Sequence, residues 1–119
     1  MADPNDPGDW RVDTAKASAL AAIDALRDEI DRIDAELVVL LNRRAAQALQ
    51  IGGIKRTLQM EIYQPSREEA VLRHVRSLNR GPLDADAIAR LFERIIDEAR
   101  RAERIASDRR DMSDSRIGE

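Results

Sequence analysis

The chain has 119 residues, a net charge of -3 and no cysteine, and these features exclude several kinds of protein. Its length fits one small domain, and 43% hydrophobic residues are enough for a core. Acidic and basic residues are interspersed, so no broad basic surface is available to nucleic acid. Without cysteine there are no disulfides or thiolate metal sites, and the single histidine, His74, makes neither a metal site nor a catalytic triad.

The first residues predict a flexible tail rather than a targeting segment. Pro4, Pro7 and Gly8 occur over residues 1–14 without periodicity, which is typical of flexible chain. MADPNDPGDW has no apolar stretch of the secretion-signal kind, and no apolar run approaches the roughly 20 residues that cross a bilayer. We therefore expect a cytoplasmic protein that does not bind membranes.

The next segment predicts one long helix from about residue 15 to residue 58. Apolar residues recur at spacings of three and four, as in a coiled coil. They are Ile23, Leu26, Ile30, Ile33, Leu37, Leu40, Ile51, Ile54 and Leu58. Such a helix would be roughly 65 Å long at 1.5 Å per residue, longer than a small domain is wide. Because one chain of this size cannot cover that stripe, we expect an intertwined homodimer.

A second, short helix is predicted after a connection that ends at Pro65. Ser66 and Glu69 have the spacing of a capping box, so the helix should begin at Ser66. It should run to Asn79, because a glycine and a proline follow shortly afterwards. His74 lies between arginines on this helix and is expected at the surface.

A third helix is predicted from Asp84, whose side chain can cap it, to about Ala106. Its apolar face comprises Ile88, Leu91, Phe92, Ile95, Ile96, Ala99 and Ala102. Residues 107–119 are polar and aperiodic, and we expect a flexible tail. The predicted fold class is therefore all-α, with three helices per chain and residues 15–106 as the helical domain.

Polar residues interrupt the apolar pattern of the first helix. Arg44 and Gln47 occupy seam positions, where a buried polar layer that fixes the register is one explanation. Lys55 lies three turns after Arg44 on nearly the same face. It could extend its amine to solvent, or the two cations could hold a small anion with two carboxylates.

Two further features of the helices call for an explanation. Gly52 and Gly53 each cost about 1 kcal/mol relative to alanine inside a helix, so a ligand or a crossing helix should approach that backbone. Glu103 continues the apolar face of the third helix, where a carboxylate must be paired or protonated. Fraying of the helix end, or pairing with Arg100 or Arg104, would also account for it.

Three stretches of the sequence together resemble the all-helical family of chorismate mutases. They are LRDEIDRIDAELVVLLNRRAAQALQIGGIK, IYQPSREEAVLRHV and NRGPLDADAIARLFERIIDEARRAE, and they span about residues 20–105 in the family's order and spacing. The resemblance implies an enzyme without cofactor or metal that rearranges chorismate to prephenate. It also implies a homodimer.

The resemblance assigns cationic residues to the substrate's carboxylates and ether oxygen. Arg27 would reach across the dimer to a carboxylate, whereas Arg44 and Lys55 would belong to the site's own chain. Arg27 precedes Arg44 by seventeen residues, about 100° around a helix, so the two cannot easily share one pocket within a chain. Lys55 would donate to the ether oxygen as that bond breaks.

The resemblance places the remaining site residues on the second and third helices. Glu68 would accept a hydrogen bond from the ring hydroxyl, beside Arg67 and the backbone of Gln64. Ala99 and Glu103 stand where relatives often carry serine and glutamine, so Ala99 should weaken substrate binding. An ionised Glu103 would repel the ether oxygen. We therefore expect it to act protonated, with a pKa raised by burial.

Two alternatives to the mutase stay open on the sequence. An isochorismate pyruvate lyase on the same fold would use the same cations, although isochorismate lacks the ring hydroxyl that Glu68 would bind. A non-catalytic dimerising or regulatory module would not need Arg27, Arg44 and Lys55 at the family's spacing. A partner enzyme from the shikimate pathway is compatible with either function.

Overall fold

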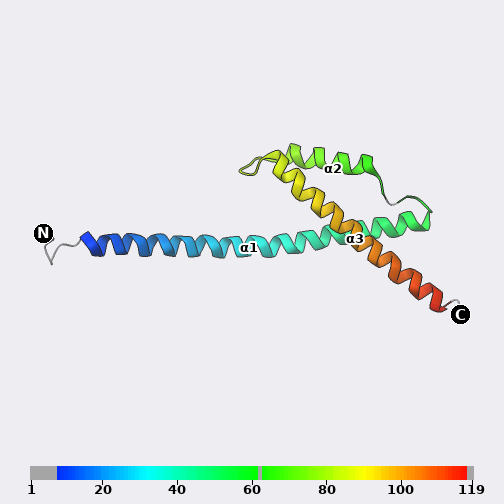
Figure 1. Ribbon diagram of the computed structural model, residues 1–119, viewed down its shortest axis with the longest axis horizontal. Helices are drawn as coiled ribbons and strands as arrows, with labels where there is room; N and C mark the ends of the chain where they lie inside the picture. Colours follow the sequence, from blue (N-terminus) through cyan, green and yellow to red (C-terminus); the bar gives the residue numbers. More distant parts are fainter. Residues whose placement is uncertain (1–7, 62, 118–119) are drawn as a thin grey trace. The chain divides into compact units, whose positions relative to one another are not determined.

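The computed structural model describes residues 8–61 and 63–117, with side chains described over residues 11–61 and 63–113, and these residues form three helices. In chain order they are α1 (Gly8–Thr57), α2 (Pro65–Leu78) and α3 (Ala85–Ile117) (Figure 1). No strand occurs within the described ranges, which confirms the all-α fold class. The chain divides into two compact units, with the boundary after Leu40. The second unit, from Leu41 onward, contains the candidate site.

Helix α1 begins at Gly8, so the predicted start near residue 15 is wrong. The first turns lack an apolar stripe, but residues 15–22 hold five alanines, the residue with the highest helix propensity. Periodicity reports burial, whereas these turns are helical because their residues favour helix. Residues 8–14, expected to be a flexible tail, are therefore helical, and the prediction for residues 1–7 lies outside the described residues.

Helix α2 begins at Pro65, and the capping box predicted at Ser66 does not form. Gln64 is the N-cap residue, without a side-chain cap, and its carbonyl accepts hydrogen bonds from the backbone amides of Arg67 and Glu68 at 3.0 and 3.3 Å. Proline suits the first helical position because its φ is already helical and its missing N–H has no partner to lose there. The helix ends as predicted, with Asn79 as C-cap residue.

Helix α3 is capped by Asp84, as predicted, because its carboxylate accepts a hydrogen bond from the Ala87 amide at 2.7 Å. The helix then continues to Ile117, so the predicted end near Ala106 is wrong. Its last turns, from Ser107 onward, are mostly polar and carry an exposed Met112. A helix that leaves the core loses its apolar periodicity without having to unwind.

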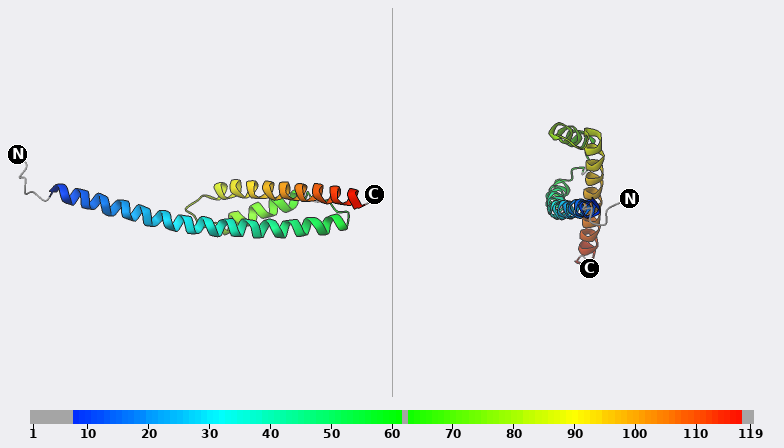
Figure 2. Two further views of the ribbon diagram at one scale, coloured as in Figure 1. Left: turned by 90° about the horizontal axis from the view of Figure 1, so that it is seen from below. Right: turned by 90° about the vertical axis from the view of Figure 1, so that its left-hand side faces the viewer.

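The core of the described chain is small and lies between α2 and α3, which pack against each other (Figure 2). Val75 of α2 and Ala89 of α3 are its buried apolar residues. The apolar stripe of α1 stays exposed, with Ile33 and Leu37 46% and 49% accessible. No described helix is long and apolar enough to cross a membrane.

Candidate active site

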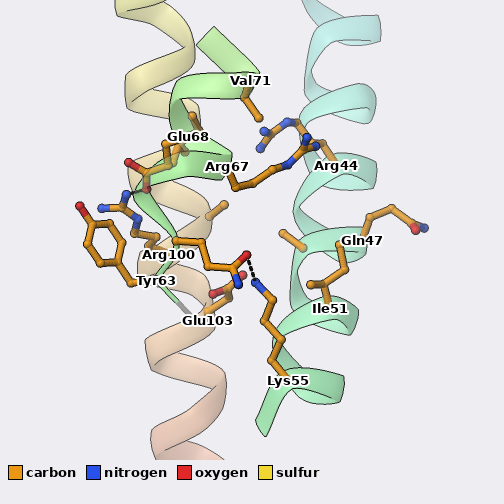
Figure 3. A pocket seen from close by; sticks show the side chains of 14 residues that line it. Arg44, Gln47, Ile51, Lys55, Tyr63, Arg67, Glu68, Val71, Arg100 and Glu103 are labelled. Atoms are coloured by element: carbon orange, nitrogen blue, oxygen red, sulfur yellow. Dashed lines mark hydrogen bonds and ion pairs between the residues drawn. The ribbon is translucent and has the colours of Figure 1, made fainter. Parts of the chain in front are cut away.

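A cavity of about 270 Å³ lies in the second unit, between the last turns of α1 and the helices α2 and α3 (Figure 3). Seven of the eight predicted site residues line it: Arg44, Lys55, Gln64, Arg67, Glu68, Ala99 and Glu103. The eighth, Arg27, is an exposed residue of the first unit. The structure thus brings together the residues that the sequence assigns to one chain's own site.

Helix α1 contributes Arg44 and Lys55, with Ala48 and Ile51 between them. All four positions line the cavity, as the helical spacing predicts. The amine of Lys55 donates a hydrogen bond to Oε1 of Gln64 at 3.1 Å (Figure 3). Gln64 therefore contacts Lys55 through its side chain, whereas only its backbone was expected in the site.

The two glycines of α1 make room for side chains of α3. A Cβ atom at Gly52 would lie 3.4 Å from Cδ of Glu103, and one at Gly53 would lie 3.3 Å from Nη1 of Arg110. Of the two explanations left open by the sequence, the geometry therefore favours a crossing helix. Gly52 allows the α1 backbone to form one wall around the Glu103 carboxyl.

Burial raises the pKa of Glu103 above its usual value, and this burial outweighs the positive charges of Lys55, Arg100 and Arg56, which lower it. The direction agrees with the raised pKa expected for this residue, whereas its action in the protonated form stays a prediction. A carboxyl group with a raised pKa keeps its proton to higher pH and can then donate a hydrogen bond. Glu103 is thus suited to donate to a developing oxyanion beside Lys55.

Glu68 of α2 forms an ion pair with Arg100 of α3, and the guanidinium of Arg100 stacks 4.5 Å from the ring centroid of Tyr63. Arg100 and Tyr63 also line the cavity, although neither was predicted as a site residue. Arg100 precedes Glu103 by three residues and so shares its side of α3, a signal that could have revealed it. Tyr63 lies in a connection without periodicity and gave no such signal.

The charges around the cavity favour a small anion. Four cations line it, from Arg44, Lys55, Arg67 and Arg100, against the carboxyl groups of Glu68 and Glu103. No cluster of metal-ligating side chains occurs among the described residues. The fold and site define an all-helical protein with a pocket in which cationic side chains outnumber acidic ones.

Comparison with known proteins identifies the family. The model of the family "Chorismate mutase type II" matches residues 26–104, which is most of the chain. The chain belongs to this family of isomerases.

Known relatives agree with this assignment. The chain is 47% identical over 78 residues to the bifunctional chorismate mutase/prephenate dehydratase of Neisseria gonorrhoeae, covering 66% of this chain and 21% of that protein. It is 34% identical over 83 residues to the T-protein of Haemophilus influenzae, covering 69% of this chain and 22% of that one. The chain thus spans about a fifth of the length of these curated relatives.

A solved structure is similar over nearly its whole length. The chorismate mutase of Thermus thermophilus, in its form II, superposes with a TM-score of 0.68 at 34% identity. The match covers 70% of this chain and 94% of that one. The fold of this chain is therefore that of a chorismate mutase.

Proposed function

We propose that this chain catalyses the rearrangement of chorismate to prephenate, a step towards phenylalanine and tyrosine. The observation that carries the proposal is the cavity in which Lys55 and a carboxyl group with a raised pKa, Glu103, stand among further cations. The reaction is intramolecular and needs no nucleophile, metal or cofactor. It needs the folded substrate conformer to be held and negative charge on the ether oxygen to be stabilised.

Each group then has one task in this proposal. Arg44 and Arg27 of the partner subunit bind the two carboxylates and hold the substrate folded. Lys55 and protonated Glu103 donate hydrogen bonds to the ether oxygen as its bond to carbon breaks. The ring hydroxyl donates a hydrogen bond to the carboxylate of Glu68. The chain's own residues thereby favour the transition state over the extended substrate.

The mutase assignment also calls for a homodimer, which we propose on the exposure of the α1 stripe. Within this stripe Leu26 is 65% accessible and Ile30 is 54% accessible in a single chain. Such a stripe is normally covered by another helix. Sedimentation equilibrium should give twice the 13.4 kDa of one chain, and a monomer at micromolar concentration would contradict the proposal.

The direct test of the function is product identification. The purified chain should convert chorismate to prephenate and should not release pyruvate from isochorismate. Pyruvate release would favour the lyase alternative. Loss of neither substrate would favour a non-catalytic module. A cytoplasmic location and a partner enzyme from the same pathway stay predictions. The bifunctional relative from Neisseria gonorrhoeae, which joins chorismate mutase and prephenate dehydratase, favours such a partner.

A further inference from the structure

We propose that Arg100 is a positioning residue that holds the Glu68 carboxylate for the ring hydroxyl of the substrate, with Tyr63 as its platform. This inference rests on the proposed function and adds a residue to it. It makes the site selective for a substrate that carries the hydroxyl.

The geometry fixes Arg100 on several sides. Its Nη2 pairs with Oε1 of Glu68, its Nη1 lies 3.8 Å from Oδ1 of Asp97, and its guanidinium stacks on Tyr63. A guanidinium held by a carboxylate on one edge and an aromatic ring on its face has little rotational freedom. Figure 3 shows the Glu68 carboxylate turned toward Arg100, with Tyr63 beyond it.

The pair is more than a surface ion pair between helices. The side chains of Arg100 and Glu68 are 30% and 27% accessible, and both line the cavity, whereas Arg94 and Glu98 pair on α3 at 76% and 45%. Partial removal from water strengthens the interaction of opposite charges. The pairing therefore orients a group that faces the cavity.

A paired Glu68 can still serve a hydroxyl. The ion pair engages Oε1, and each carboxylate oxygen has two lone pairs, so acceptor capacity remains for an O–H donor. Without Arg100, Glu68 would have to be ordered by the substrate itself, and that ordering weakens binding.

The test compares chorismate with an analogue that lacks the ring hydroxyl. Arg100→Met keeps much of the side chain's length and removes its charge. The KM for chorismate should rise about tenfold, because a poorly ordered Glu68 loses its charge-assisted hydrogen bond with the ring hydroxyl. The change in kcat should be smaller. The inhibition constant of the analogue should change less than twofold. Arg100→Lys keeps the charge without the planar fork and should restore part of the loss.

A neighbouring residue supplies the matched control. Arg101 follows on α3, is exposed, and lies 3.8 Å from Glu98 without lining the cavity, so Arg101→Met should leave both constants unchanged. Equal weakening of chorismate and analogue by Arg100→Met would overturn the inference, because a purely structural role predicts that result. If Arg100→Met does not fold, Tyr63→Leu, outside the helices, must show the same selective loss. Turnover by the wild-type chain separately decides the proposed function.

Discussion

Chains carrying Lys55→Ala or Arg27→Ala should each be almost inactive alone and should regain activity when mixed. Removing Lys55 takes away a donor to the breaking ether oxygen, a loss of about 100- to 1000-fold in kcat for comparable groups. Removing Arg27 takes away the guanidinium that, in the proposal, binds a substrate carboxylate in the other subunit's site. Steady-state rates with chorismate measure both losses.

The recovery identifies the subunit from which Arg27 acts. In a mixed dimer one site combines the intact Lys55 of one chain with the intact Arg27 of its partner, while the other site lacks both. Random exchange makes half of the dimers mixed, so about a quarter of wild-type activity should return in a symmetric two-site dimer. If Arg27 serves its own chain, no mixed site is complete and no activity returns. Arg32→Ala, which breaks only an exposed pair with Glu29, is the control for α1 and should remain active.

The activity of the chain should fall as pH rises through the raised pKa of Glu103. Below that pKa the carboxyl group carries a proton and donates to the ether oxygen. Above it, the carboxylate repels the developing negative charge, so activity should fall about tenfold per pH unit for one essential proton. Glu103→Gln supplies a permanent donor, and its rate should stay level over the same pH range.

A profile of kcat/KM against pH for both proteins tests this expectation. An unchanged descending limb in Glu103→Gln would assign the titration to another group. Glu98, on the same helix, is paired with Arg94 and does not line the cavity, so Glu98→Gln should reproduce the wild-type profile. The comparison separates loss of one negative charge on α3 from loss of the group in the site.

Features that repeat along the chain or depend on local chemistry could be predicted from the sequence. The three-four spacing placed Lys55 and Arg44 on one face, and both line the cavity. Glu103 could be identified because a carboxyl group on the apolar face of a helix has to be paired or protonated. The cap of α3 at Asp84 followed from side-chain chemistry within four residues.

Exact helix ends and features that depend on contacts between helices were harder to predict from the sequence. Ser66 had the pattern of a cap, but Pro65 begins α2 one residue earlier and takes the first helical position. The ends of α1 and α3 extend beyond the apolar pattern because their outer turns are polar or alanine-rich helix. In the sequence Arg100 cannot be distinguished from a surface arginine, because its partner Glu68 lies on another helix, α2. Arg27 depends on a second subunit, and its role stays a prediction.

The bare backbone at Gly52 shows how a local weakness of a helix can set the chemistry of a side chain on another. Alanine there would strengthen α1 by about 1 kcal/mol from propensity alone. Its methyl group, however, would lie 3.4 Å from the Glu103 carboxyl carbon. The environment that raises the pKa of Glu103 is thus shaped partly by the absence of a side chain at position 52. A side chain at position 52 would therefore act both on the helix propensity of α1 and on the surroundings of this acid.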